Sequence, residues 1–231
     1  MHPLDNVIWN ALMTRDAHFA EGTGISRRFI REVGPLGAFI EHGEAGYESL
    51  AELVKPGETV GLFLDEPYEE RPGWAFVVGA PLLQMVWQDG ATPMKTGNGS
   101  CPEIIPLGDK DSPEMIDLTS LTKPGPFSTR THELGRYLGI RERGMLVAMA
   151  GERLKVPGYT EVSAVCTHPE HTGKGYAALL MLEVMRGILE RGETPFLHVR
   201  MDNERAIALY ERLGFTKRLS GHFAVLRAAQ E

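Results

Sequence analysis

The sequence predicts an α+β fold, with a mixed, mostly antiparallel sheet flanked by helices and a smaller α+β unit in front of it. Three observations lead to this prediction. A run of β-formers over 160–167 leads through a glycine-bearing loop into a periodic apolar segment over 177–189, which is typical of strand, loop and helix. An apolar strand over 196–199 then completes a parallel β-α-β unit. Paired apolar runs on both sides of this unit predict hairpins.

The N-terminal part is predicted to be a small α+β unit without a recognisable set of catalytic residues. Its expected elements are helices over 7–18 and 45–54 and strands over 59–64, 74–78 and 82–87. A polar, glycine-containing stretch over 89–100 follows this unit and is typical of a domain boundary. We therefore expect two domains, at 1–98 and 102–231.

The C-terminal part alternates strands and helices with clear stop signals. Ser112 and Pro113 have the form of a helix start, Asp202 or Asn203 is expected to cap the last helix, and Gly214 is expected to end it. The expected elements are a strand over 103–107, a helix over 112–121, a hairpin over 137–141 and 145–150, the strand 160–167, the helix 177–189, the strand 196–199, a helix over 204–213 and a terminal hairpin over 215–219 and 222–226.

Composition limits the classes of partner. The chain of 231 residues has a formal net charge of -7, which disfavours nucleic acid and anionic lipid and suits a cationic or amine-bearing partner. Its 2 cysteines, Cys101 and Cys166, support neither a disulfide scaffold nor a cysteine zinc site. The sequence shows no targeting segment and no apolar run long enough for a membrane span, so we expect a cytoplasmic protein, as a monomer or homodimer.

The loop before the 177–189 helix carries the chemistry of an anion site. Gly173 and Gly175 let the backbone approach a ligand, and the unpaired N–H groups and the dipole of the helix N-terminus favour a pyrophosphate. The run Gly173 to Ala178 also fits a dinucleotide-binding pattern, which makes a nicotinamide enzyme a competing interpretation. In that fold the glycine turn follows its strand directly, whereas here 168–172 intervene, and the chain ends too soon for the remaining parallel strands.

Two runs of residues carry a family resemblance: Thr172-Gly173-Lys174-Gly175-Tyr176-Ala177 as a phosphate motif, and Asn203 to Phe215 as a signature of Asn, Ala, Tyr and Gly-Phe that includes Tyr210 and Gly214-Phe215. With this order of elements, the chain resembles the GNAT superfamily of acyl-CoA-dependent N-acyltransferases over roughly 102–226, and within it the FR47-like group, in which a degenerate GNAT-like half precedes the catalytic one. Thr172 departs from the Gln or Arg of the phosphate motif, which weakens a side-chain contact but leaves the backbone N–H. The resemblance implies a GNAT fold that uses acetyl-CoA as cosubstrate.

The resemblance also implies roles for individual residues. Asn203 would contact the pantetheine arm, and Tyr210, two helical turns later and roughly 10 Å along the axis, would protonate the departing thiolate. The strand 160–167 would splay from its neighbour so that pantetheine pairs with the backbone of Val165, Cys166 and Thr167. A backbone N–H there would stabilise the oxyanion of a direct attack by an amine acceptor.

Other roles stay open at this stage. Glu161 occupies the position at which several GNAT enzymes carry a general base, with Glu152 or a water as alternatives. Cys166 is expected to be a small buried hydrophobe rather than a nucleophile. His168, His171 and His198 lack the spacing of a metal site, so no metal is expected. A non-catalytic CoA sensor is the second functional hypothesis, and the sequence does not identify the amine acceptor.

Overall fold

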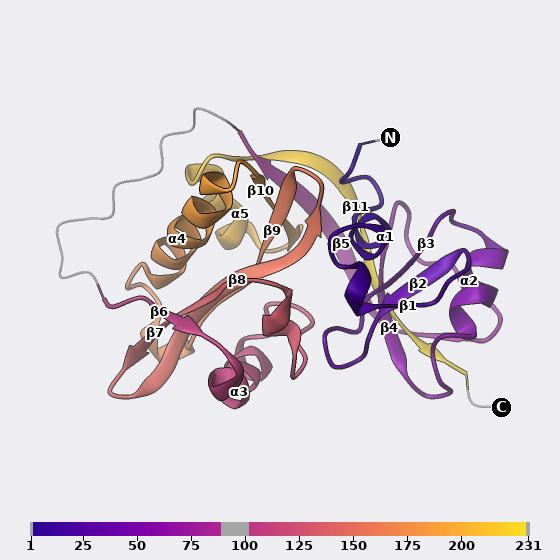
Figure 1. Cartoon of the computed structure of the whole chain (residues 1–231), viewed down its shortest axis with the longest axis horizontal. Helices are drawn as coiled ribbons and strands as arrows, with labels where there is room; N and C mark the ends of the chain where they lie inside the picture. Colours follow the sequence, from indigo (N-terminus) through magenta and orange to yellow (C-terminus); the bar gives the residue numbers. More distant parts are fainter. Residues whose placement is uncertain (1, 89–101, 230–231) are drawn as a thin grey trace.

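A computed structural model describes residues 2–88 and 102–229 (Figure 1). Its elements in chain order are α1 (Val7–Met13), η1 (Ala17–Phe19), β1 (Ala20–Glu21), β2 (Ser26–Phe29), β3 (Gly37–Phe39), α2 (Glu44–Ala51), β4 (Thr59–Leu64), β5 (Trp74–Trp87), β6 (Ile105–Leu107), η2 (Asp109–Asp111), α3 (Ser112–Thr122), η3 (Thr131–Leu134), β7 (Tyr137–Glu142), β8 (Met145–Val156), β9 (Tyr159–Thr167), η4 (Pro169–His171), α4 (Tyr176–Glu190), β10 (Thr194–Arg200), α5 (Glu204–Arg212) and β11 (Phe215–Ala228).

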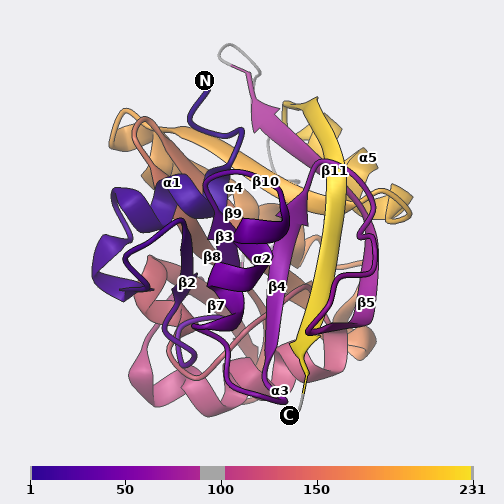
Figure 2. The same cartoon turned by 90° about the vertical axis from the view of Figure 1, so that its right-hand side faces the viewer.

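An eight-stranded mixed sheet dominates the structure, with the strand order β4-β11-β5-β10-β9-β8-β7-β6. All its pairings are antiparallel except the one between β9 and β10, which confirms the predicted α+β class and the parallel β-α-β unit. Strands β1, β2 and β3 form a separate small antiparallel sheet. Figure 2 shows the long β11 running beside β4 and β5.

The end of the chain differs from the prediction. Instead of a terminal hairpin, residues 215–228 form one strand, β11, which pairs with β5 on one edge and β4 on the other. Gly221 lies within this strand, where a Cβ would come within 2.7 Å of the Leu64 carbonyl oxygen. This glycine therefore allows a close approach of β4 and does not form a turn. The two strands predicted over 74–78 and 82–87 are likewise one strand, β5.

The N-terminal strands take part in the same sheet as the C-terminal ones. Strand β5 lies between β10 and β11, so the sheet is continuous across the two predicted domains. The predicted boundary at 89–100 lies outside the described residues. The helix predicted over 7–18 ends at Met13, and the strand predicted over 145–150 extends to Val156. Most other predicted elements are confirmed with small shifts of their ends, although Asp111, not Ser112, is the N-cap of α3.

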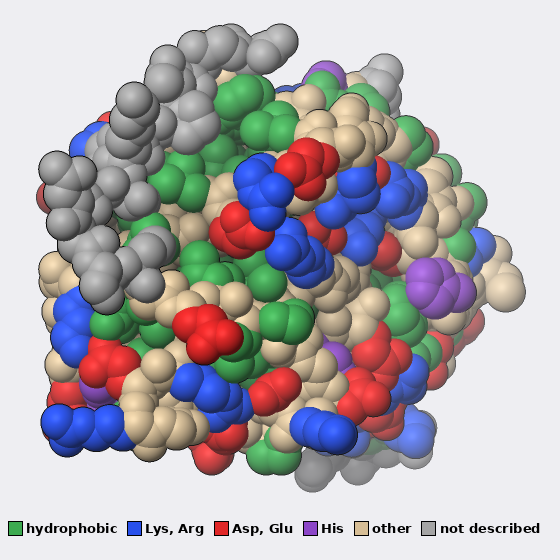
Figure 3. All heavy atoms as spheres, turned by 60° about the vertical axis from the view of Figure 1, so that its left-hand side comes forward, with side chains coloured by type: hydrophobic (Ala, Val, Ile, Leu, Met, Phe, Trp, Pro, Cys, Tyr) green, Lys and Arg blue, Asp and Glu red, His purple; other side chains and the backbone are tan. Residues whose placement is uncertain are grey.

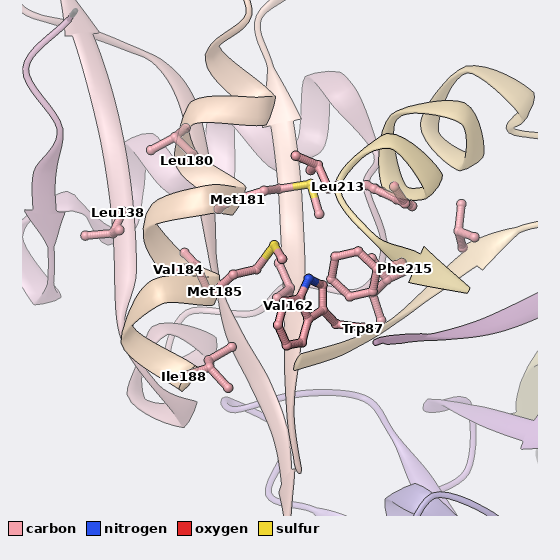
Figure 4. Close-up of a cluster of buried hydrophobic side chains, with 14 of the residues drawn as sticks. Trp87, Leu138, Val162, Leu180, Met181, Val184, Met185, Ile188, Leu213 and Phe215 are labelled. Carbon is pink, nitrogen blue, oxygen red and sulfur yellow. The ribbon is translucent and has the colours of Figure 1, made fainter. Parts of the chain in front are cut away.

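Two layers of side chains cover the sheet. On one face α4 and α5 pack on a core in which Met181 and Met185 lie beside Trp87 and Phe215 (Figure 4). On the other face, Phe196 of β10 and Leu154 of β8 pack with α1, β2 and β3. Neighbouring residues of β10 thus point to opposite faces, which decides the side on which each polar residue lies.

The surface carries charges of both signs. On the face in Figure 3, acidic and basic side chains are interspersed and do not gather into one basic field. Within the ranges 2–88 and 102–229, none of the helices combines the length and the apolar character needed to cross a bilayer.

Candidate active site

The predicted anion loop leads directly into α4. Gly173 and Gly175 have φ values of 82° and 80°, in the left-handed region that favours glycine, and Gly175 is the N-cap of α4. No atom outside the adjacent residues lies within 4 Å of a Cβ built on either glycine, so the backbone here is open to approach. The N-terminus of α4 has no side-chain cap. These features fit a pyrophosphate held by backbone N–H groups.

Side chains beside the loop form a charged cluster around Glu142, at the end of β7. Lys174 Nζ lies 2.6 Å from the Glu142 carboxylate, and the Tyr176 hydroxyl also donates to it. These two contacts lower the pKa of Glu142 to about 2. Thr172 Oγ1 donates to the carbonyl of Pro169 at 3.0 Å, so this residue stabilises the bend of the loop.

Three potential metal ligands also lie in this loop, although the sequence analysis expects no metal. Nitrogen or oxygen atoms of His168, Glu170 and His171 lie within 4.8 Å of one another. His168 Nδ1 accepts the Glu170 backbone N–H at 3.3 Å, and His171 Nδ1 lies 3.2 Å from Glu142 and 3.3 Å from Lys174 Nζ. One nitrogen of each ring therefore already has a protein partner.

Strands β9 and β10 form a fork. They pair only over Tyr159, Thr160 and Glu161 of β9, after which the two strands separate. Beyond this point Ala164 has a φ of 53°, and the register of β9 against β8 shifts between Ser163 and Cys166, which marks a β-bulge. The backbone over 162–167 consequently has no described strand on its β10 side. A ligand in extended conformation fits there as an added strand.

Cys166 lies in this stretch and is almost fully buried. Burial raises the pKa of its thiol to about 11, which keeps it protonated at neutral pH and unsuited to nucleophilic attack. The side chain packs with Met149 and Met115. These contacts agree with the expected role of Cys166 as a small hydrophobe.

Helix α5 presents the second predicted pair of residues. Asn203 is its N-cap, with Oδ1 accepting the Ala206 N–H at 3.2 Å, which confirms the predicted helix start. Tyr210 is 9 % exposed, lies in the core cluster on the α4 face and meets Phe215 edge to face. Burial raises the pKa of Tyr210 to about 12, so its hydroxyl stays protonated and available as a proton donor.

Glu161 lies at the base of the fork, on the face opposite α4, but it is fully buried. Arg153 binds both of its oxygens, at 2.7 and 2.8 Å, and His198 Nδ1 lies 2.7 Å from Oε1. Burial alone would raise the pKa of Glu161, but the charge and hydrogen bonds of Arg153, with those of His198, lower it to about 2. This environment weighs against direct proton transfer from an amine to Glu161.

The alternative base, Glu152, is held elsewhere. It is buried and forms ion pairs with Arg191 at 2.9 Å and Lys155 at 3.3 Å. Arg191 is the C-cap of α4, so Glu152 lies toward the end of this helix opposite the glycine loop. The structure therefore does not bring Glu152 together with Tyr210.

Sequence reasoning did not assign roles to Arg153, His198 and Gln84, which complete the network around Glu161. The one available signal was a polar residue, His198, within the apolar run 196–199. Gln84 of β5 is 3.1 Å from His198 Nε2 and comes from a strand 114 residues earlier in the chain. A contact at this separation cannot be anticipated from local pattern.

Two cavities lie near these elements. One of about 350 Å³ is lined by residues of α1, β4, β5, β10 and β11, including His198 and Gln84. The other, of about 420 Å³, lies between Arg28, Glu58 and the segment around Phe127. The first one includes His198 and Gln84 of the network around Glu161 in its lining and is thus the better place for a reacting group.

Comparison with known proteins agrees with this geometry. Residues 137–224 match the family that is described as FR47-like protein. A protein from Novosphingobium aromaticivorans that is assigned to the GNAT family of acetyltransferases shares 38% identity, with 100% of both chains covered and a TM-score of 0.89. The tandem GNAT protein of the clavulanic acid biosynthesis pathway has the same fold at 14% identity, with a TM-score of 0.55 over 100% of this chain and 98% of that one.

A shorter match links the chain to a curated protein. N-alpha-acetyltransferase RimI of Mycobacterium tuberculosis is 37% identical over 101 residues, which are 41% of this chain and 63% of the length of that relative. The forked sheet, the glycine loop and the similarity along the whole chain lead to one conclusion: the protein belongs to the GNAT family of acetyltransferases.

Proposed function

We propose that this protein transfers the acetyl group of acetyl-CoA to a primary amine by direct attack. The separation of β9 and β10 after Glu161 carries the proposal, together with the uncapped glycine loop at the start of α4 and Tyr210 in the core on the α4 face. An acyl-CoA needs these three features, namely a site for pyrophosphate, an edge for pantetheine and a proton donor for sulfur.

The residues of the fork suggest how acetyl-CoA is held. The backbone over 172–177 binds the pyrophosphate, and the residues Val165 to Thr167 pair with the pantetheine arm. Asn203 at the start of α5 contacts the same arm from the other side. A backbone N–H of β9 beside the bulge stabilises the negative charge that develops on the thioester oxygen.

The reaction then requires two proton transfers. The amine nitrogen bonds to the thioester carbon and loses a proton, the carbon–sulfur bond breaks, and the thiolate takes the hydroxyl proton of Tyr210. On the amine side the expected base is Glu161 or a water. Because Glu161 is fully buried and paired with Arg153, the proton reaches this carboxylate only through an intermediate group.

The test is thiol release from acetyl-CoA with a panel of primary amines, using wild type and Tyr210→Phe. We expect kcat of the variant to fall by on the order of 10²-fold or more while the Kd for acetyl-CoA changes little, because only the proton donor is lost. Tyr68→Phe removes a hydroxyl from the N-terminal part and is the matched control. Full kcat in Tyr210→Phe would exclude Tyr210 as the acid.

Calorimetry separates acyl transfer from the sensor hypothesis. Acetyl-CoA should bind wild type, and Gly175→Glu should abolish binding, because the new side chain strains a positive φ and places a carboxylate where the pyrophosphate sits. Binding without thiol release for any amine would instead support a sensor. No heat with wild type would contradict both functions.

A further inference from the structure

The cavity of about 350 Å³ on the face opposite α4 has a reactive group in its wall. Val7 and Ile8 of α1 and Phe63 of β4 supply an apolar surface, while His198 of β10 and Gln84 of β5 supply polar atoms. Residues of α1, β4 and β5 line this cavity together with residues of β10 and β11. It therefore lies between the two halves of the chain.

The hydrogen bonds of Gln84 determine which of its atoms faces the cavity histidine. Arg218 Nη1 donates to Gln84 Oε1 at 2.7 Å, and Gln84 Nε2 donates to the Leu4 carbonyl at 3.0 Å. The amide nitrogen, not the oxygen, is thus 3.1 Å from His198 Nε2. Because an amide nitrogen only donates, His198 Nε2 accepts this hydrogen bond through its lone pair.

The opposite side of the ring is oriented by a carboxylate. His198 Nδ1 lies 2.7 Å from Glu161 Oε1, and Arg153 keeps Glu161 ionised. The ring proton that faces Glu161 therefore resides on Nδ1, and Nε2 presents its lone pair toward Gln84, the other polar residue of this part of the cavity lining. A carboxylate behind Nδ1 also stabilises the imidazolium that forms when Nε2 takes up a proton.

His198 also occupies the right place along its strand. It is two residues beyond Phe196, the last residue of β10 that pairs with β9. Alternation along the strand puts it on the face of Phe196 and Glu161, whereas Tyr210 belongs to the core on the α4 face. The imidazole and the phenol hence lie on opposite faces of the sheet.

We propose that His198 is the catalytic base that accepts the proton of the amine, and that Glu161 is a positioning residue behind it. This inference rests on the proposed acetyl transfer. As the amine nitrogen bonds to the thioester carbon, its proton passes to His198 Nε2, while the sulfur takes the proton of Tyr210. The N–H of the approaching amine takes the place of the Gln84 N–H at Nε2, and the lone pair of the amine nitrogen is free to bond to the thioester carbon.

The cavity also indicates the class of acceptor. Its lining mixes apolar side chains with polar ones, and of its two carboxylates Asp5 is already paired with Arg218, whereas Asp65 is exposed. One amine beside His198 is therefore accommodated better than a polycation. We assign to it a primary amine carried on a small group with some apolar surface, such as alanine amide.

The first test compares His198→Gln with wild type in thiol release, with alanine amide as acceptor. We expect kcat to fall by on the order of 10²-fold or more at an unchanged Kd for acetyl-CoA, and the acid limb of the kcat/KM pH profile to disappear. His18→Gln removes an exposed histidine that does not line the cavity, and this variant should retain the wild-type kcat and the acid limb of the pH profile. An acid limb and kcat retained in His198→Gln would overturn the inference.

A second pair of variants tests the network without removing the imidazole. Gln84→Glu places a carboxylate opposite Nε2, which stabilises the imidazolium and should move the acid limb to higher pH. Glu161→Gln removes the negative charge behind Nδ1. This variant should move the acid limb to lower pH and should also lower kcat. The other titratable groups of the cavity are Asp5, Asp65, His42 and His222. Two further charged groups lie behind the network, Arg218 beside Gln84 and Arg153 beside Glu161. None of these residues is substituted in either variant. Identical pH profiles in all three proteins would contradict the network.

The outcomes separate this inference from the function on which it rests. If wild type releases thiol and Tyr210→Phe is impaired while His198→Gln is not, only the role of His198 fails. If wild type releases no thiol with any amine, both proposals fail. A higher kcat/KM for spermidine than for alanine amide would overturn the assigned acceptor class.

Discussion

At the scale of residues, two buried carboxylates show how neighbours decide the chemistry of a side chain. Asp16 and Glu161 are 2% and 0% exposed. Burial raises the pKa of Asp16 to about 7, because its main contact is the neutral Lys155 N–H at 3.0 Å. Glu161 is buried more deeply, yet Arg153 lowers its pKa to about 2. A guanidinium in contact therefore outweighs burial.

This difference predicts a pH-dependent stability for Asp16. Between pH 3.8 and about 7 the folded state binds a proton that the unfolded state has released, so this group makes the protein less stable as pH rises. Asp16→Asn keeps an acceptor oxygen for Lys155 but carries no charge. We expect it to raise the free energy of unfolding at pH 8 by up to roughly 4 kcal/mol, with a smaller gain at pH 5.

Urea unfolding at both pH values measures this effect. Asp117→Asn, at an exposed position of α3, is the control and should change little. Equal unfolding midpoints for wild type and Asp16→Asn at pH 8 would show that the buried Asp16 carboxylate does not lower the stability of the folded protein.

Arg153 supplies the second prediction at this scale. Arg153→Met leaves the Glu161 carboxylate buried without its bidentate partner, and we expect the variant to lose on the order of 3–5 kcal/mol of stability at pH 7. Thermal or urea unfolding checks this loss. Arg130→Met removes the partner of Glu133 at the surface, and comparable destabilisation by both variants would argue against a special role of burial.

At the scale of elements, the start of α5 combines a structural and a proposed binding function in one residue. Asn203 Oδ1 caps the helix through the Ala206 N–H, while its amide is proposed to contact pantetheine. Helix capping needs only a side-chain oxygen, which serine also provides. The two functions can therefore be separated by substitution.

We expect Asn203→Ala to lower the stability of the protein by about 1 kcal/mol and to weaken acetyl-CoA binding, because both cap and amide are lost. Asn203→Ser keeps a capping oxygen, so its stability should stay near that of wild type while its Kd for acetyl-CoA still rises. Unfolding curves and calorimetry measure the two effects. Wild-type affinity in Asn203→Ser would remove this residue from the ligand site.

At the scale of the whole molecule, the two predicted domains share one sheet. Strand β5 of the N-terminal part pairs with β10 and β11 and contributes Leu83, Met85 and Trp87 to the core under α4. The cavity beside His198 also needs residues of both parts. The halves on either side of the predicted boundary at 89–100 thus contribute alternating strands, β4-β11-β5-β10, to one part of the sheet.

We therefore expect a fragment of residues 102–231 not to fold cooperatively, because both β10 and β11 would lose the strand between them. Circular dichroism during urea unfolding should show a single cooperative transition for the full chain and none for the fragment. A cooperative transition in the fragment would support an independent C-terminal domain and contradict this expectation.

The sequence by itself determined the β-α-β unit, the glycine loop and the Asn203-to-Tyr210 helix. These features depend on local signals, namely apolar period, positive-φ glycines and helix caps, which lie within a few residues of one another. Such signals predict the positions of Gly175, Asn203 and the two parallel strands. In the structure Gly175 and Asn203 are the N-caps of α4 and α5, and β9 and β10 pair in parallel.

Only the tertiary structure decided which groups surround the fork. The insertion of β5 beside β10 and the contacts of Glu161 with Arg153 and His198 join segments that are distant in the chain. Gly221 in β11 shows the same limit, because a glycine that looks like a turn residue serves close strand packing. Pairing of distant strands depends on the burial of the whole core, and no local pattern records it.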